Sequence, residues 1–344
     1  MGLGMLYENS LLERLERSLR AVLPAWKLSS DGDLRLLTIS ENATFLAEEG
    51  GRRVVLRVHR PGYHSEAEIR SELSWIEALR RDGVVETPRP LRAEDGELLV
   101  RFMDGPSARY AVAFEHMSGR EPEATSDLPH WYRHLGEISA RLHDHARRWT
   151  RPADFVRKRW DFETILGRDA YWGDWRAAPG LDGEGLALLE RLQVRLEAEC
   201  RAAGQGGDRF GLVHCDMRAA NLLVEGDRLG VIDFDDCGLS WFGYDFAASI
   251  SFIEHEPIVP ALRQAWLEGY ARVSPFPEEQ ARLLPMFVML RRMQLTAWIA
   301  SHAETPTALA LGPAFSRGTV DLARAYMDDA GASVGADEAG VRAA

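Results

Sequence analysis

The chain has 344 residues, of which 46% are hydrophobic and 27% are charged. This composition is ordinary for a folded protein, and the length allows two lobes with separate cores. The formal net charge of -12 argues against nucleic acid and against an anionic membrane surface as partners, because a negative surface repels other polyanions.

The sequence carries no signal for export or for membrane insertion. The start, MGLGMLYENSLLERLE, lacks the basic and apolar regions of a signal peptide, and the most apolar late stretch is interrupted by Arg291 and Arg292. Cys200, Cys215 and Cys237 are odd in number and lack metal-site spacing, so a disulfide framework or a zinc site is not expected. We expect a cytoplasmic protein with reduced thiols.

The first third of the chain alternates between strand and helix patterns. Leucines at helical spacing over residues 11–24 predict an amphipathic helix. Residues 43–59 predict one β-hairpin and residues 96–117 predict another, each about a glycine-containing turn. Between the hairpins, residues 64–83 predict a helix with one apolar face that ends at a glycine.

The rest of the chain is mostly helical. Long helical patterns cover residues 127–149, 185–202 and 278–303, and a short hairpin over residues 222–233 stands between the last two. This order predicts an α+β fold with a small β-rich N-lobe (1–117) and a large mostly helical C-lobe (118–325). The small polar residues of 326–344 predict a disordered tail.

The stretch HCDMRAANLLVEGDRLGVIDFDD, residues 214–236, carries the chemistry. Acids at the end of an apolar strand repel one another unless a cation lies among them. Asp216 can orient an acceptor hydroxyl and take its proton, while Asn221 and Asp233 can bind Mg²⁺ through oxygen. One such motif alone is weak, but its coupling to the strand that ends at Asp233 makes it strong.

These segments resemble the catalytic loop and metal-binding segment of the protein-kinase-like fold. Within that fold the sequence is similar to the aminoglycoside phosphotransferase and choline kinase superfamily, over roughly residues 35 to 325. VHRPG, SENATF, GREPE and LRRMQLTAWIA resemble in particular the bacterial stress response Ser/Thr kinases. The resemblance implies a two-lobed phosphotransferase that uses ATP and Mg²⁺.

The resemblance also implies roles for residues outside the motif. Arg57 would hold the nucleotide phosphates and Glu72 would be its partner, although Glu66 and Glu68 compete for that place. The hinge FEHMSGREP would place Glu115 and Met117 beside the nucleotide.

Other implied roles concern the motif itself and the loop over the phosphates. Arg218 occupies the position where protein kinases have a basic residue that helps to hold the transferring phosphoryl group. His214 and Asp245 would order the catalytic loop.

Three departures from the family pattern stand out. Arg57 replaces the usual lysine, and its planar guanidinium differs from a compact ammonium. Cys215 replaces a small glycine, which we interpret as tolerated packing. The loop ISENATF lacks the glycine-rich pattern, so Ser40 and backbone amides would contact the phosphates.

The leading hypothesis is therefore transfer of the γ-phosphoryl group of ATP to a hydroxyl, with Mg²⁺. The acceptor is either a protein Ser/Thr, which the subgroup resemblance favours, or a small alcohol such as an aminoglycoside, a choline-like amine or homoserine. A nucleotide-binding pseudokinase is an alternative, and a two-metal hydrolase ranks last because it leaves the hairpin, helix and hinge order unexplained.

Two features stay open at this level. The segment 159–180 concentrates five aromatic residues, and could form either an acceptor-binding insert or a cap that packs on the large lobe. Asp235 and Asp236 could contribute to the site, but we expect at least one of them to be a solvated turn residue.

Overall fold

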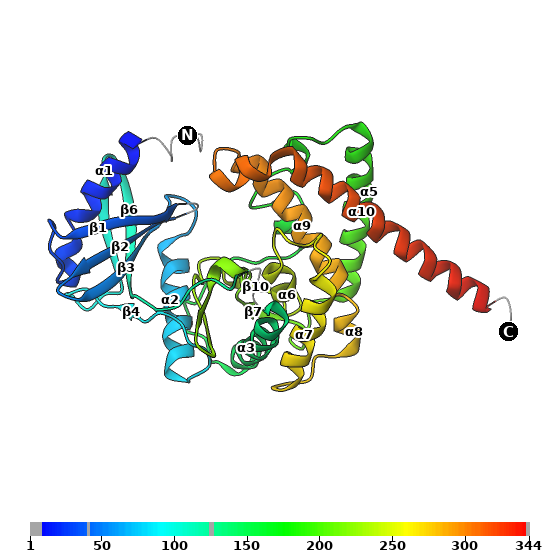
Figure 1. The fold of residues 1–344 in the computed structure, drawn as a ribbon, viewed down its shortest axis with the longest axis horizontal. Helices are drawn as coiled ribbons and strands as arrows, with labels where there is room; N and C mark the ends of the chain where they lie inside the picture. The colour runs from blue at the N-terminus through cyan, green and yellow to red at the C-terminus, as the bar shows by residue number, and fades with distance from the viewer. Residues whose placement is uncertain (1–8, 40–41, 124–126, 342–344) are drawn as a thin grey trace.

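The computed structural model describes residues 9–39, 42–123 and 127–341, with side chains described from residue 11 to residue 329 within those ranges. Figure 1 shows a small lobe built on a sheet beside a large, mostly helical lobe, so the predicted α+β two-lobed architecture is confirmed. The small lobe contains α1 (Asn9–Arg20), the 3-10 helix η2 (Leu23–Trp26), β1 (Asp33–Ile39), β2 (Ala43–Glu49), β3 (Arg52–Val58), α2 (Glu66–Arg81), β4 (Pro90–Leu91), β5 (Leu99–Asp104) and β6 (Ser107–Glu115).

The small-lobe sheet is antiparallel, in the order β1-β2-β3-β6-β4, with β5 also paired to β6. Both predicted hairpins are present. The β2–β3 turn uses Gly50 and Gly51 at φ +56° and +81°, which glycine adopts without steric cost. Strand β1 was not predicted, because Leu34 is its only buried residue and its alternation is weak.

Helix α1 and η2 cover one face of this sheet. Leu15, Leu19 and Trp26 are buried there against Phe45 and Leu56, and together they form the core of the small lobe. This contact explains the leucine spacing that predicted the N-terminal helix.

Helix α2 joins the small lobe to the large one. It begins with a capping box, in which Ser65 and Glu68 satisfy each other's backbone N–H groups. The apolar face predicted from the sequence is buried in the core of the large lobe, and the Trp75 ring lies edge-on to Phe234 at 5.5 Å between centroids. The helix therefore fixes the small lobe against the segment that carries the acidic motif.

The large lobe contains α3 (Leu128–Arg148), α4 (Phe162–Ile165), η3 (Trp175–Ala177), α5 (Gly183–Ala203), β7 (Phe210–Val213), η4 (Ala219–Asn221), β8 (Leu222–Glu225), β9 (Arg228–Val231), β10 (Gly238–Trp241), α6 (Tyr244–Ser249), α7 (Val259–Ala271), α8 (Glu278–Ala281), α9 (Leu284–Ser301) and α10 (Pro306–Val341). The helical patterns predicted at 127–149 and 185–202 correspond to α3 and α5. The pattern at 278–303 is divided into α8 and α9, and Pro285 lies in the first turn of α9, where its missing N–H costs nothing.

Helices α3 and α7 lie side by side at an unusually close distance. A Cβ added at Gly136 would lie 2.0 Å from the carbonyl oxygen of Trp266, and one added at Gly269 would lie 1.8 Å from that of Arg133. Glycine at both positions therefore lets the two backbones meet. Helix α9 is buried along most of its length at the centre of the lobe.

The last described segment of the chain is helical, and the disordered tail expected at residues 326–344 stays a prediction. Helix α10 continues through residues 326–341, and Figure 1 shows its last part extending away from the large lobe. The alanines and acidic residues of this segment, and the lack of proline after Pro313, are compatible with a helix, which the polar composition alone did not indicate. The exact domain limits at residues 117 and 325 stay predictions. No helix in the described ranges has the length and apolar character needed to cross a membrane.

Candidate active site

An aspartate at the start of α6 binds the backbone of the loop that follows β7. Asp245 accepts hydrogen bonds from the backbone N–H groups of His214 at 3.3 Å and Cys215 at 2.8 Å. Nδ1 of His214 accepts from the N–H of Asp216 at 3.2 Å, and Nε2 donates to the carbonyl of Ile232 at 3.1 Å. These contacts agree with the ordering roles expected of His214 and Asp245.

Cys215 adopts a left-handed backbone conformation, with φ +67°, and its side chain is buried. A non-glycine residue costs about 1–2 kcal/mol in this region. The glycine that the family usually has at this position is therefore explained by the backbone. Our interpretation of Cys215 as a matter of packing overlooked this constraint.

Asp216 lies at the centre of a set of polar contacts. Nδ2 of Asn221 donates to Oδ2 and to the backbone carbonyl of Asp216, at 2.8 Å in both cases. Nε of Arg218 lies 3.4 Å from Oδ2, and Nη2 of Arg291 lies 2.8 Å from Oδ1. Three residues of the predicted motif thus meet, together with an arginine from a distant helix.

Arg291 is the residue of this site that the sequence analysis missed. It belongs to α9, is 3% exposed, and also donates to Ser251 Oγ at 3.0 Å and to Gln294 Oε1 at 3.2 Å. Burial alone would lower its pKa, but the charges of Tyr244 and Asp216 raise it above the ordinary value, so the cation persists. An arginine inside an otherwise apolar helix was the available signal, since buried charges need partners.

The acids after β9 point in different directions. Asp233 has φ +62° and a side chain that is 48% exposed. Asp235 turns inward, is buried, and accepts a hydrogen bond from Nδ2 of Asn42 at 2.7 Å. Asp236 is half-buried and accepts from the Tyr63 hydroxyl at 2.7 Å. Neither Asp235 nor Asp236 is therefore the freely solvated residue that we expected at one of these positions.

Asn221 and Asp233 form a donor set suited to a divalent cation. The N–H of Ile232 donates to the carbonyl of Asn221 at 2.9 Å, which brings the two residues to the same end of the β8–β9 hairpin. Partial removal from water raises the pKa of Asp233 above its ordinary value, Arg57 opposes this shift, and the charges of Asp235 and Asp216 add to it. A hard cation bound by these oxygens would relieve that repulsion, so the residues fit the expected metal.

Arg57 and Glu72 make a buried pair between β3 and α2. Nη2 of Arg57 lies 2.6 Å and 2.7 Å from the two carboxylate oxygens of Glu72, while Nη1 lies 3.2 Å from Oδ1 of Asp233. Burial alone would lower the pKa of Arg57, but Glu72, Asp235 and Asp233 raise it well above the ordinary value.

The competing glutamates have other partners. Glu68 accepts from the backbone N–H of Ser65 at 2.7 Å at the start of α2, and Glu66 pairs with Arg70 at 2.9 Å on the outer surface. Glu72 is therefore the partner of Arg57, which spacing alone left open.

Three further residues were predicted to contact the nucleotide, namely Ser40, Glu115 and Met117. Ser40 lies outside the described residues. Glu115 ends β6 and pairs with Arg89, and Met117 lies two residues further on, with its Cε methyl against Gly230. Both residues thus occupy the connection between the lobes, while their contact with a nucleotide stays a prediction.

The aromatic segment 159–180 reaches the site. Trp160 Nε1 donates to the carbonyl of Asp236 at 2.8 Å, and Trp172 Nε1 lies 3.4 Å from the Tyr63 hydroxyl. The Arg291 guanidinium lies 5.2 Å from the centroid of the Trp172 ring. The segment is well packed, as the cap interpretation expects, and one of its faces borders Arg291, as the insert interpretation expects.

Residues 34–283 match the model of the family described as "Phosphotransferase enzyme family". This match covers well over half of the chain. The chain belongs to this family. The predictions of a phosphotransferase and of membership in the aminoglycoside phosphotransferase superfamily are confirmed at this level.

Individual proteins are also similar to this phosphotransferase. A solved structure titled "Structure of the microcompartment-associated aminopropanol kinase" shares 41% identity, with a TM-score of 0.85, over 90% of this chain and 97% of that one. The curated amicoumacin kinase of Bacillus subtilis is 21% identical over 77% of this chain and 79% of its own. The structure of amicoumacin kinase hAmiN with AMP-PNP, Ca²⁺ and Ami shares the fold, with a TM-score of 0.74, 18% identity, and coverage of 92% of this chain and 94% of that one.

The named relatives bear on the acceptor that the sequence left open. They are named as kinases of aminopropanol and of amicoumacin, which are small molecules. They support the superfamily assignment and give no support to the narrower resemblance to stress response Ser/Thr kinases. The small-molecule alternative therefore fits this phosphotransferase better than the protein acceptor that we favoured from the sequence.

Proposed function

We propose that this phosphotransferase transfers the γ-phosphoryl group of ATP to the hydroxyl of a small amino alcohol, with Mg²⁺ as the metal. The observation that carries the proposal is the 41% identity, over nearly the whole of both chains, to the aminopropanol kinase structure. A hydroxyl acceptor also suits Asp216, whose carboxylate is 15% exposed and held in place by Asn221 and Arg291.

The side chains divide the chemistry among themselves. Asp216 orients the acceptor hydroxyl and takes up its proton as the oxygen attacks. Arg57, fixed by Glu72, would face the nucleotide phosphates, and Asn221 with Asp233 would hold Mg²⁺, which would supply positive charge to the phosphates. Arg218, 39% exposed beside Asp216, can contact the phosphoryl group in transfer.

The environment of Asp216 suits a compact acceptor. Arg291 contacts the carboxylate and lies over the ring of Trp172, and Trp172 contacts Tyr63 of the small lobe. The net charge of -12 attracts a cationic substrate over the long range. The cytoplasmic location stays a prediction.

A labelled-phosphate assay tests the proposal. The full chain is incubated with Mg²⁺ and γ-labelled ATP, with a panel of amino alcohols, the matching alcohols without an amine, homoserine, choline, and a generic basic protein. We expect label to enter amino alcohols, and to be lost in Asp216→Asn while that variant still binds ATP. Label in the basic protein alone would overturn the proposal in favour of a protein kinase. ATP binding without any transfer, across an extended panel, would favour the pseudokinase alternative.

A further inference from the structure

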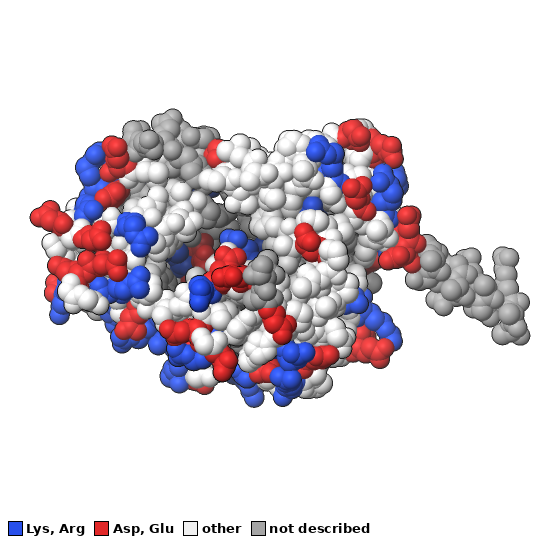
Figure 2. All heavy atoms as spheres, in the orientation of Figure 1, with Lys and Arg blue, Asp and Glu red and all other residues white. Residues whose placement is uncertain are grey.

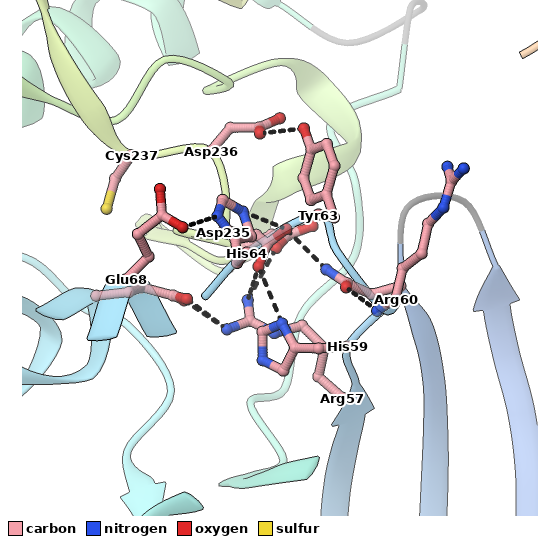
Figure 3. Close-up of polar contacts among 12 residues, drawn as sticks. Arg57, His59, Arg60, Tyr63, His64, Glu68, Asp235, Asp236 and Cys237 are labelled. Atoms are coloured by element: carbon pink, nitrogen blue, oxygen red, sulfur yellow. Dashed lines mark hydrogen bonds and ion pairs between the residues drawn. The ribbon is translucent and has the colours of Figure 1, made fainter. Parts of the chain in front are cut away.

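A second polar cluster lies where the β3–α2 loop of the small lobe meets the turn after β9. Figure 3 shows His59 and His64 from that loop pointing toward Asp235, with Tyr63 reaching Asp236. His64 Nε2 lies 3.3 Å from Asp235 Oδ2, and His59 Nδ1 lies 3.6 Å from Asp235 Oδ1. This cluster takes no part in the phosphoryl transfer proposed above.

Several buried polar atoms of the cluster lack a hydrogen-bond partner among the described residues. They are both ring nitrogens of His59, both ring nitrogens of His64, and Oδ1 of Asp235. The imidazole of His64 is fully buried and that of His59 is 2% exposed. Buried polar atoms without partners are costly, and several in one place indicate a bound ligand or ion.

We propose that a divalent transition-metal ion binds between His64, Asp235 and Asp236, at a site separate from that of Asn221 and Asp233. One ligand atom from each of the three residues lies within 4.8 Å of the others. Two ligands at 2.0–2.1 Å from one tetrahedral ion are roughly 3.4 Å apart, which matches the 3.3 Å between His64 and Asp235.

The ligand types select the class of metal. One imidazole and two carboxylates suit Zn²⁺, Co²⁺ or Mn²⁺, whereas Mg²⁺ prefers an all-oxygen octahedral shell. The Asp235 oxygen that lies 3.3 Å from His64, Oδ2, also accepts a hydrogen bond from Asn42, and Asp236 accepts one from Tyr63, so both carboxylates are oriented by neighbours.

Three cations border the cluster. Arg57 binds Glu72 and Asp233 and also lies 3.8 Å from Oδ1 of Asp235, while Arg157 donates to the backbone carbonyls of Cys237 and Asp235. The ammonium of Lys158 lies 3.4 Å from the centroid of the Tyr63 ring. These cations oppose a metal and limit its affinity, so micromolar binding is expected.

The ion would cross-link the small lobe to the large lobe. His64 precedes α2 in the small lobe, while Asp235 and Asp236 follow the metal-binding strand of the large lobe. A proton on His64 is the competing occupant, since an imidazolium would pair with Asp235 at 3.3 Å and with Glu68 at 3.9 Å. The two possibilities can be told apart, because only a metal site binds Zn²⁺ or Co²⁺ when no other ligand is added.

Calorimetric titration with metal alone separates them. The full chain is first freed of metal with a chelator, and no nucleotide is added. It is then titrated with Zn²⁺ in the calorimeter. In a separate titration with Co²⁺, binding is followed by visible absorption. We expect one ion per chain, a cobalt spectrum typical of low coordination, and stabilisation against heat. His64→Gln should weaken binding at least about tenfold, while Asp233→Asn and His255→Gln, at an exposed histidine, should retain it.

Three results would overturn the proposal. They are no Zn²⁺ or Co²⁺ binding above that of a surface-histidine control protein, binding unchanged in His64→Gln, or binding lost in Asp233→Asn. If His64→Gln does not fold, Asp236→Asn serves the same purpose, because this half-buried carboxylate leaves the histidine in place.

Discussion

The guanidinium of Arg291 lies 2.8 Å from the carboxylate of Asp216, although 75 residues separate them along the chain. Arg291 is anchored by Ser251 and Gln294, so it positions Asp216 from the large-lobe core. Figure 2 shows a hollow between the two lobes in which both acidic and basic side chains lie, as expected for a site built from paired charges.

Replacing this arginine should impair catalysis more than nucleotide binding. In Arg291→Lys the shorter, non-planar head group cannot keep its contacts with Asp216, Ser251 and Gln294 together. Displacement of the base by about 1 Å costs on the order of 10²-fold in rate, so we expect kcat to fall by about that factor and KM for ATP to change little. Steady-state kinetics measure both.

The neighbouring arginine supplies the control. Arg292 is equally buried but pairs with Glu254 and donates to Thr319, away from Asp216. Arg292→Lys should lower thermal stability while leaving kcat of the folded protein near the parent value. Equal losses of kcat in the two variants would show that Arg291 acts only through general stability.

Glu72→Gln should be strongly destabilising. The change leaves Arg57 buried without its carboxylate partner, and breaking a buried pair in this way costs about 3–5 kcal/mol. Glu66→Gln, which breaks an exposed pair with Arg70, should cost about 1 kcal/mol or less. Chemical denaturation of both variants checks this prediction. Similar losses would mean that the Arg57–Glu72 pair contributes no more than a surface contact.

The part of the site that lies within one sequence segment could be predicted. Asp216, Asn221 and Asp233 come from a loop and a short hairpin, so their order in the chain nearly determines their arrangement. The pairing of Arg57 with Glu72 needed a resemblance, because residues 68 and 72 share a helix face and spacing does not separate them. Burial separates them in the structure, since Glu72 is 0% exposed.

Contacts between distant segments could not be predicted. The apolar surroundings of Arg291 in the sequence indicate a buried cation with a partner, but nothing near it identifies that partner as Asp216. At least one of Asp235 and Asp236 was expected to be a solvated turn residue, yet Asn42 and His64 from the small lobe contact Asp235. Strand β1 was missed because it has only one buried side chain.

Asp233→Ala should remove the response to Mg-ATP. The raised pKa of Asp233 means that the folded state disfavours its charged form, so the change removes net repulsion, although it also removes the contact with Arg57 at 3.2 Å. In the parent, ligand at a hundredfold excess over Kd stabilises by about 2.7 kcal/mol. Thermal unfolding with and without Mg-ATP measures the difference, and an equal shift in variant and parent would exclude Asp233 as a metal ligand.

His143 should make stability depend on pH. Burial lowers the pKa of the His143 imidazole, and the charge of Arg147 lowers it further. The Asp245 carboxylate, 2.9 Å away, and the Asp144 carboxylate raise this pKa, but the net shift is downward. Because the unfolded chain binds the proton more readily, this contribution is complete above pH 6.5 and is lost as pH falls from 6.5 toward the folded-state pKa.

Urea unfolding at several pH values tests the sign. The slope from one such group cannot exceed about 1.4 kcal/mol per pH unit. His143→Gln should be less stable than the parent at pH 8, because the contacts with Asp245 and Tyr270 change, but should lose less stability between pH 6.5 and 5. Parallel curves for the two proteins would assign the acid sensitivity to other groups.

Trp172→Phe should affect the acceptor rather than ATP. The indole lies between Tyr63 and Arg291, and the smaller ring would loosen the side of the site that faces Asp216. We expect KM for the amino alcohol to rise about tenfold, equivalent to about 1.4 kcal/mol, with KM for ATP unchanged. Tyr171→Phe is the matched control, because Tyr171 is 42% exposed and its ring contacts Trp160 instead. If both variants keep the parent KM for the acceptor, segment 159–180 is only a packed cap; if Trp172→Phe alone changes it, one face of the segment contacts the substrate.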